Sequence, residues 1–250
     1  MVASSVSYEV RVALRDAAGG LSIQAVPSLA ALRDRAALER LEPVRAVQAL
    51  RHKVGRVRYQ PVLSLDLMVA CDSRLEALRV IELERAGGLV WIVGQPLQLV
   101  AYENGRVARR HVPDLLYGLD DGRVVLENVR PLERRSAAFV AQEALCERIA
   151  GRVGWSYSTV GSYPGMAGSV LMHLWGYAVV EPRVEVVERV VGAFRESSTW
   201  PLRRLVERCG RWEVAYPCIM ALIWRGHLEV SLEARLDAWS LVAMGPGVEA

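Results

Sequence analysis

The chain has 250 residues, of which 52% are hydrophobic and 24% charged, and its formal net charge is +3 at pH 7. These values exclude a disordered or fibrous chain and predict a globular protein with one sizeable domain and a smaller one. No apolar run approaches the ~20 residues that span a bilayer, and the N-terminus lacks a secretory signal pattern. We therefore expect a cytoplasmic protein without a membrane partner.

Several common site types lack their sequence signatures. The four cysteines and four histidines are widely spaced and form none of the close pairs typical of zinc sites or disulfide frameworks. The glycine-rich loop G-x-x-x-x-G-K-[ST] of nucleotide hydrolases is missing as well. We expect reduced thiols, no zinc site and no P-loop.

The first 42 residues are predicted to form a hairpin and a helix. Segments Tyr8 to Leu14 and Leu21 to Val26 flank Ala17-Ala18-Gly19-Gly20, which is typical of a hairpin. A solvated helix is expected from about Ser28 to Leu41.

Basic residues are concentrated between Arg33 and Arg58, with eight Lys/Arg against three acidic residues. Such a stretch can lie along a phosphate backbone. The alternative is the solvated helix with ordinary surface arginines. On the first interpretation the DNA contacts are Arg51, Lys53, Arg56 and Arg58.

The middle of the chain predicts an α/β region. Asp72-Ser73 followed by Leu75, Leu78 and Ile81 starts a helix that ends at Gly87-Gly88. Strands are predicted after it at Leu89–Val93, Leu97–Tyr102, Arg106–Val112 and Val124–Val129. A second helix is predicted at Ala137–Ile149 and a final strand at Trp155–Val160. The expected order of the core is helix, three strands, helix, strand.

Polar residues in this region suit a divalent metal. Glu76 falls in the first turn of the predicted helix, and Asp114 follows a strand. Mg²⁺ takes oxygen ligands, commonly one or two carboxylates completed by waters and phosphates, and the bound metal activates water for phosphodiester hydrolysis. Glu76 and Asp114 are thus candidate ligands for Mg²⁺ or Mn²⁺.

Two further candidates lie at the end of the strand Val124–Val129. Period-two alternation puts Asn128 and Arg130 on one face of that strand and Glu127 on the other. Asn128 offers a neutral oxygen, and Arg130 can stabilise developing negative charge but stays protonated and cannot act as a base. The catalytic candidates are therefore Glu76, Asp114, Asn128 and Arg130.

Each of these signals also has a purely structural interpretation. Ser73-x-x-Glu76 is a helix capping box, and Pro113-Asp114 is an ordinary turn after a strand. Gln95-Pro96 can simply end a strand. His111 lies near the candidate site and is expected to pack or cap locally.

The same residues resemble a known family when they are taken in order. Seven short stretches look like the TnsA-like endonuclease subunit of heteromeric transposases, in the PD-(D/E)xK nuclease superfamily: Pro43-Val44-Arg45, Asp72 to Glu76, Gln95-Pro96, Arg109 to Leu115, Asp121-Gly122-Arg123, Asn128 to Pro131 and Gly154 to Tyr157. The resemblance covers roughly residues 43 to 180. It implies an α/β core with a metal site at one end of a central sheet.

The resemblance also implies function and partners. A TnsA-like subunit cuts one strand at transposon ends, beside a separate transposase subunit and an AAA-type ATPase. Carried over to this chain, Glu76 and Asp114 are metal ligands, Asn128 stands where a second strand acid is expected, and Arg130 stands at the lysine position. Lys53 is the only lysine and lies well before the motif, so no D/E-x-K is present.

Residues after about Glu181-Pro182 form a different pattern. Helices are predicted at Val184–Phe194, Pro201–Cys209 and Tyr216–Trp224, with Pro217 in the first turn of the third. His227–Val230 and Ala238–Val242 follow as a possible β-ribbon. This order is winged-helix-like, and winged helices bind DNA or partner proteins equally readily.

Three segments are thus predicted: 1–42, a hairpin and helix; 43–181, a PD-(D/E)xK restriction-endonuclease-like core; and 182–250, a winged-helix-like domain. Two functions stay open. The chain is either a metal-dependent DNA endonuclease subunit of a transposition assembly, or a catalytically inactive subunit of the same fold that binds DNA or docks its partners.

Overall fold

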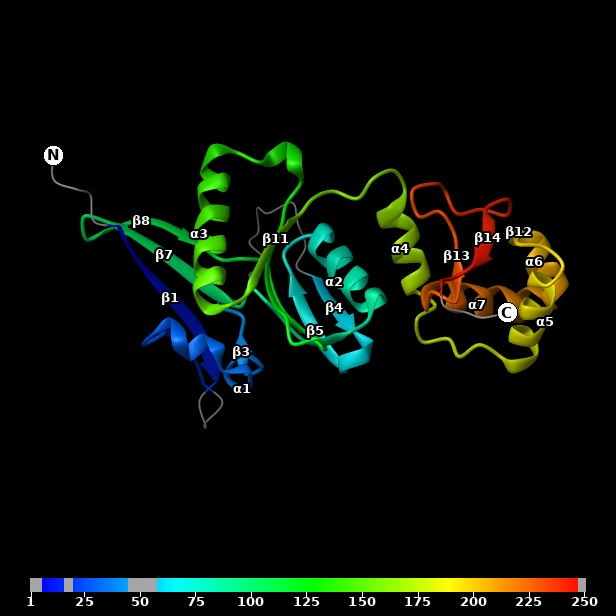
Figure 1. Cartoon of the computed structure of the whole chain (residues 1–250), viewed down its shortest axis with the longest axis horizontal. Coiled ribbons are helices and arrows are strands. Elements are labelled where there is room, and N and C mark those ends of the chain that lie inside the picture. The colour runs from blue at the N-terminus through cyan, green and yellow to red at the C-terminus, as the bar shows by residue number, and fades with distance from the viewer. Residues whose placement is uncertain (1–5, 16–19, 45–57, 247–250) are drawn as a thin grey trace. The chain divides into compact units, whose positions relative to one another are not determined.

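The structure is a computed structural model that describes residues 6–15, 20–44 and 58–246. The chain divides into two compact units, Met1–Ser162 and Tyr163–Ala250 (Figure 1). The division falls earlier than the expected boundary at residues 181 and 182. Helix α4, Ala167–Trp175, lies in the second unit because it packs on α7, Trp212–Trp224.

The N-terminal hairpin is confirmed and joins a larger antiparallel sheet. Its strands run in the order β2-β1-β7-β8, with β3 also pairing with β1. Figure 1 shows β1, β7 and β8 side by side near α3. The bounds are β1 Val6–Arg15, β2 Leu21–Ala25, β3 Leu41–Glu42, β7 Leu97–Glu103 and β8 Arg106–His111.

The single helix expected from Ser28 to Leu41 is wrong. Two short helical segments take its place, the 3₁₀ turn η1 (Leu29–Arg33) and α1 (Arg35–Leu38). Asp34 between them has an extended backbone, and its side chain accepts a hydrogen bond from the Ala36 amide. An Asp that caps the following turn interrupts the preceding one.

A second, four-stranded sheet lies at the centre of the first unit in the order β11-β10-β9-β6. β10 and β11 are parallel, whereas the other neighbours are antiparallel. The sequence does not predict strand β9, and the hairpin β7–β8 belongs to the other sheet. The bounds are β6 Leu89–Gly94, β9 Leu115–Leu119, β10 Val124–Val129 and β11 Ser156–Val160.

Two helices flank this sheet, and both begin where the sequence predicts. Ser73 caps α2 (Arg74–Ala86), which ends before Gly87 at φ 74°. Ser136 caps α3 (Ala137–Val153), which ends before Gly154 at φ 85°. Serine oxygens satisfy the first amides of a helix, and glycine adopts positive φ without strain. A two-stranded ribbon, β4 (Arg58–Val62) with β5 (Leu67–Cys71) and the 3₁₀ turn η2 (Leu63–Leu65) between them, packs on α2.

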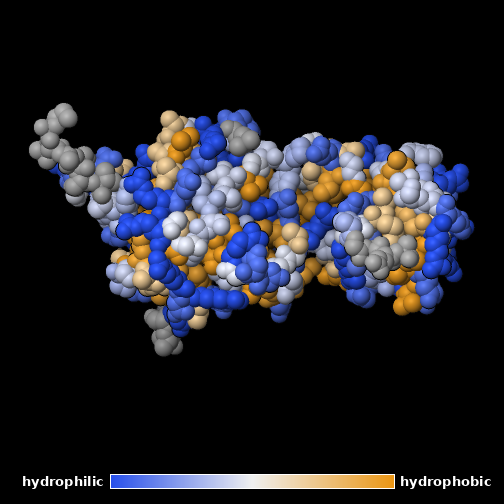
Figure 2. All heavy atoms as spheres, in the orientation of Figure 1, coloured by the Kyte–Doolittle hydropathy of each residue, from blue (hydrophilic) through white to orange (hydrophobic). Residues whose placement is uncertain are grey.

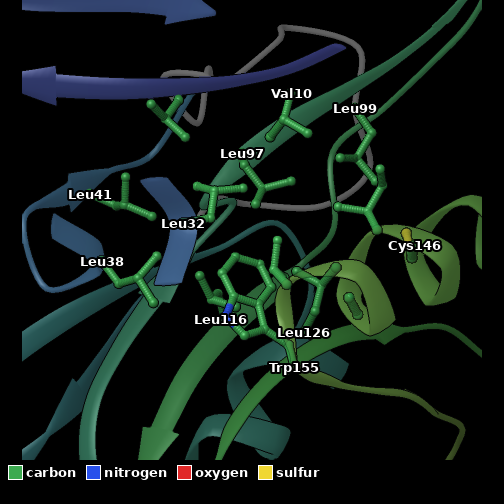
Figure 3. Close-up of a cluster of buried hydrophobic side chains, with 14 of the residues drawn as sticks. Val10, Leu32, Leu38, Leu41, Leu97, Leu99, Leu116, Leu126, Cys146 and Trp155 are labelled. Carbon is green, nitrogen blue, oxygen red and sulfur yellow. The ribbon is translucent and has the colours of Figure 1, made fainter. Parts of the chain in front are cut away.

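Alternation along β10 separates two hydrophobic cores. Leu126 points into a core shared with α3 and the N-terminal sheet, whereas Val125 and Val129 point into a core shared with α2. Figure 3 shows the first core, where Val10, Leu97 and Leu99 of the N-terminal sheet face Leu116, Leu126 and Trp155. Truncating such a buried leucine to alanine typically costs about 2–5 kcal/mol.

Over residues 163–246, the second unit has four helices and a small sheet of order β12-β14-β13. The helices predicted at the positions of α5 and α6 are confirmed. The predicted ribbon forms as β13 with β14, although its second arm begins at Leu241 and not at Ala238. The sequence does not predict strand β12. The bounds are α5 Val184–Phe194, β12 Thr199–Pro201, α6 Leu202–Cys209, β13 Leu228–Glu229 and β14 Leu241–Met244.

Helix α7 departs from the prediction at its start. It begins at Trp212 and not at Tyr216, so Pro217 lies inside the helix rather than in its first turn. From Cys218 to Trp224 every side chain is buried. A helix that is apolar all round belongs to the core of its unit.

The surface view in Figure 2 shows hydrophilic and hydrophobic residues interspersed over the visible face of both units. Within the described residues, no helix has both the length and the apolar character needed to cross a membrane.

Candidate functional site

Glu76 is buried at the start of α2 and caps its own helix. Its two carboxylate oxygens accept hydrogen bonds from the Asp72 amide at 2.6 Å and the Ser73 hydroxyl at 2.8 Å. The Glu76 amide in turn donates to Ser73 Oγ at 3.1 Å. This reciprocal pairing is a capping box. The structural interpretation of Ser73-x-x-Glu76 is therefore confirmed.

Asp114 holds the end of β10. Its Oδ2 accepts a hydrogen bond from the Val129 amide at 2.7 Å, and its own amide donates to the Glu127 carbonyl at 3.1 Å. The Asp114 carbonyl accepts from the amide of Gln95, a buried residue at φ 52°. The Pro-Asp turn thus ties the β6–β7 junction to β10.

Both predicted ligands lie around one thiol. Burial raises the pKa of the Cys71 thiol to about 12, and the negative charges of Glu76, Asp72 and Asp114 contribute to the same rise. Cys71 ends β5, directly before the cap of α2. The structure thus brings Glu76 and Asp114 to the same region, although each carboxylate already accepts a hydrogen bond from the protein.

Asn128 is completely buried, and its amide is engaged at both ends. Its Oδ1 lies 3.0 Å from His111 Nε2, and its Nδ2 donates to the Tyr157 hydroxyl at 2.8 Å and to Cys146 Sγ at 3.8 Å. Because an amide oxygen only accepts, His111 Nε2 carries the hydrogen in this contact.

The contacts of Asn128 continue as a chain of hydrogen bonds towards α3. The Tyr157 hydroxyl lies 2.9 Å from Thr159 Oγ1, which donates to Glu143 Oε1 at 2.7 Å. Arg135 Nε donates to Glu143 Oε2 at 2.7 Å. Since the single hydroxyl hydrogen of Thr159 goes to Glu143, the Tyr157 hydroxyl is the donor to Thr159. Each donor, from His111 to Thr159, then points towards the carboxylate of Glu143. We call this series of hydrogen bonds, from His111 through Asn128, Tyr157 and Thr159 to Glu143, the Asn128 relay.

Burial affects the acidity of two groups that contact Asn128. It raises the pKa of the Tyr157 hydroxyl to about 12 and that of the Cys146 thiol to about 12. Asn128 opposes the rise in both pKa values, because it donates a hydrogen bond to each group. Both groups therefore stay neutral at pH 7, and Glu143, paired with Arg135, is the carboxylate of the relay.

Arg130 points towards α3 as well, in agreement with the predicted face. Its guanidinium carbon lies 4.5 Å from the centre of the Phe139 ring, and its Nε donates to the Arg134 carbonyl at 3.0 Å. These contacts hold Arg130 at the start of α3.

Glu127 lies on the opposite face, as the alternation predicts. Arg79 of α2 donates two hydrogen bonds to its carboxylate, at 2.7 and 2.9 Å. Tyr117 and Ser158 donate to the same carboxylate at 3.1 and 2.8 Å. Glu127 is thus the anion of a buried ion pair, and the groups that bind it belong to the protein core.

The fit to a divalent cation is incomplete. Among the described residues, no group of three or more His, Cys, Asp or Glu side chains is arranged to hold a metal. Glu76 and Asp114 remain two carboxylates, the oxygen of Asn128 is used by His111, and Glu127 is bound by Arg79. A divalent cation here would depend on Glu76 and Asp114, with waters and phosphates completing its coordination.

The predicted DNA contacts cannot be placed. Arg51, Lys53 and Arg56 lie outside the described residues, as does the side chain of Arg58, whose backbone opens β4.

Sequence reasoning misses most partners of Asn128. It predicts only packing or capping for His111 and no role for Tyr157, Thr159, Glu143 and Cys146. Alternation indicates that Tyr157 and Thr159 share a face, and the spacing of Glu143 and Cys146 puts them on one side of a helix. These side chains meet Asn128 because β10 pairs in parallel with β11. That pairing cannot be predicted from the sequence of either strand alone.

Comparison with known proteins adds no relative: no protein-family model matches the chain, and no curated protein matches it.

Proposed function

We propose that the first unit has a PD-(D/E)xK-type core and that the chain is a DNA-binding subunit of a transposition-type assembly whose own cleavage chemistry is weakened or lost. Three features support the proposed core. The central sheet has the order β11-β10-β9-β6 with one parallel pair, α2 and α3 contact opposite faces of β10, and Glu76, Asp114 and Asn128 lie at the expected element ends.

The proposed loss of cleavage activity rests on the Asn128 relay. An acid at this position would bring a third negative ligand towards a metal. This chain instead has a neutral amide whose oxygen and nitrogen both contact protein groups. At the lysine position, Arg130 is directed to Phe139 and the Arg134 carbonyl.

A second candidate function is the active endonuclease with Mg²⁺ or Mn²⁺. It is supported by the presence of two acidic side chains, Glu76 and Asp114, whose negative charges both raise the pKa of the Cys71 thiol. If a metal binds there, those two side chains would hold it, and it would supply charge neutralisation and an activated water.

Plasmid nicking in Mn²⁺ separates the two functions. We expect the wild-type chain to leave supercoiled plasmid intact and Asn128→Asp/Arg130→Lys to gain nicking that disappears again on adding Asp114→Asn. Robust nicking by the wild-type chain that disappears in Asp114→Asn would establish the endonuclease instead.

For the second unit we propose a winged-helix-like module that docks protein partners, the transposase subunit and the AAA-type ATPase, rather than reading DNA. The support is α7, whose last two turns are buried and whose exposed residues are confined to its start, at Arg211, Trp212 and Glu213. A buried helix cannot enter a DNA groove. Arg211→Gln/Trp212→Ala should leave the Kd for duplex DNA unchanged, and a tenfold weakening would assign DNA reading to this unit.

A further inference from the structure

Arginines from separate segments meet at the first turns of α3. Arg109 of β8 donates from Nη1 to the Ala138 carbonyl at 3.2 Å. Arg130, just after β10, lies over the Phe139 ring, and its Nε bonds the carbonyl of Arg134. Arg134 is exposed and ends the 3₁₀ turn η3 (Leu132–Arg134), two residues before Ser136, which caps the helix. We call Arg109, Arg130 and Arg134 the α3 arginine cluster.

The positive charge of this cluster is not neutralised within the described part of the chain. No carboxylate there forms an ion pair with any of the three arginines, and the neighbouring Arg135 takes Glu143. Several arginines elsewhere are paired with carboxylates, for example Arg123 with Asp121 and Arg203 with Glu207. Glu133, which precedes Arg134, is exposed and forms no ion pair with these arginines in the described part of the chain. Like charges repel one another, so the arrangement favours an external anion.

The cluster is also oriented in advance. A guanidinium has five N–H donors, and Arg109 and Arg130 each use one of theirs on a backbone carbonyl of this region. The remaining donors keep the planar fork that matches phosphate oxygens. Holding a side chain in place by one hydrogen bond reduces the entropic cost when the ligand binds.

The position of the cluster relates it to the candidate site. His111 lies two residues after Arg109 on the same side of β8 and contacts Asn128, and Arg130 lies two residues after Asn128. A ligand on the cluster therefore lies beside the strand position where the family's second acid is expected.

We propose that the α3 arginine cluster binds phosphate groups of a duplex DNA backbone. This inference rests on the proposed function, since it assigns the DNA contact to residues other than Arg51, Lys53, Arg56 and Arg58. DNA is favoured over a single small anion because three guanidinium groups from two stretches of the chain present more donors than one phosphate accepts.

The test is a salt titration of binding to a fluorescent duplex of random sequence, with the full chain and Arg109→Gln/Arg130→Gln/Arg134→Gln. Glutamine removes the charge but keeps an N–H donor for the backbone carbonyls, so the fold is retained, as circular dichroism can verify. The log–log slope of the binding constant against salt should fall by about 0.9 for each phosphate that is no longer neutralised, so by up to about 3 units. At low salt the affinity should fall at least tenfold.

The matched control is Arg123→Gln/Arg203→Gln/Arg204→Gln, which removes the same charge from exposed arginines that already have carboxylate partners. It should keep the wild-type slope. Equal decreases in the two triple variants would overturn the inference, because net charge alone would then explain binding. Unchanged binding in the cluster variant would overturn it too, while leaving the proposed DNA function intact.

A different result would contradict the proposed function itself. The wild-type chain could bind duplex DNA without any dependence on salt, or not bind it at all. Either result would rule out both DNA as the ligand and the α3 arginine cluster as its contact. If polyglutamate competes as well as duplex at equal charge, the cluster binds acidic proteins instead.

Discussion

Neighbouring residues on β10 place polar groups in two different environments. On the α2 face, Glu127 is an ionised carboxylate held by two hydrogen bonds from Arg79 and by two hydroxyls. On the α3 face, Asn128 is a neutral amide between an imidazole, a hydroxyl and a thiol. Both side chains are completely buried.

The difference teaches where a buried charge is tolerated. A carboxylate removed from water needs a cation with good geometry, and the planar guanidinium of Arg79 provides it. At Asn128 the corresponding arginine, Arg130, is directed to the start of α3. The strand therefore keeps its acid on the α2 face, where Arg79 pairs with it, and a neutral amide on the α3 face.

The largest effect is expected from breaking the charged side of this comparison. Arg79→Met leaves the Glu127 carboxylate buried without its cation, which typically costs about 3–5 kcal/mol. Urea denaturation should show this decrease in the free energy of unfolding. The double variant Arg79→Met/Glu127→Leu should recover most of it, and an equal decrease in both variants would show that Arg79 matters for packing rather than charge.

Introducing a charge at Asn128 should lower the free energy of unfolding by less than the loss of Arg79. Asn128→Asp removes the donor to Tyr157 and Cys146 and buries an anion, so we expect a decrease of about 2 kcal/mol in the free energy of unfolding. Asp121→Asn, a matched exchange of amide and acid in an exposed turn, serves as the control for substitutions of this kind. Unchanged stability of Asn128→Asp would mean that position 128 accepts an anion and the relay does not require a neutral group.

The capping box on α2 should contribute about 1 kcal/mol. Ser73→Ala removes the acceptor for the Glu76 amide and the donor to its carboxylate, and removal of a serine cap costs about 0.5–2 kcal/mol. Ser136→Ala at the start of α3 is the matched variant, because Ser136 also caps through one amide. If Ser73→Ala changed nothing, Glu76 would be positioned by something other than its own helix.

The smallest effect concerns the two thiols that lie near the predicted site. Burial raises the pKa of Cys71 and Cys146 from the ordinary 9.0 to about 12, so both stay protonated in the folded chain while the unfolded chain ionises. The stability this difference contributes is complete below pH 9 and is lost as the pH rises towards 12. Between pH 9 and 9.5 the free energy of unfolding should fall by less than about 1 kcal/mol. Each thiol contributes at most about 1.36 kcal/mol per pH unit.

Removing the thiols checks that assignment. Cys71→Ala/Cys146→Ala should flatten the decline in unfolding free energy between pH 9 and 10. In the wild-type chain, Ellman's reagent should label neither thiol of the folded state at pH 8. Rapid labelling of Cys71 would contradict the raised pKa.

Much of the fold is predictable because its signals are local. Ser73 and Gly87 mark the two ends of α2, and Asn104-Gly105 marks the β7–β8 hairpin. The end of α3 is predicted too early, because the helix continues past Ile149 and Gly151 to Val153. Which sheet that hairpin joins is not a local property, because it depends on pairing with β1 some ninety residues earlier along the chain. Strand β9 escapes prediction since its residues are buried on both faces and show no alternation.

The candidate site is predictable in composition but not in contacts. The sequence places Glu76 on a helix and Asn128 on a chosen face of a strand, and both placements hold. It cannot show that Glu76 is anchored to its own cap or that His111 and Tyr157 take both ends of the Asn128 amide, because the partners of Asn128 come from segments far apart.

The central claim is that the Asn128 relay replaces a metal ligand, and Mn²⁺ binding measured by isothermal titration calorimetry tests it most directly. We predict that the wild-type chain shows no saturable site for Mn²⁺ below millimolar concentration and that Asn128→Asp gains one that requires Asp114. A single stoichiometric site in the wild-type chain, abolished in both Glu76→Gln and Asp114→Asn, would contradict the claim.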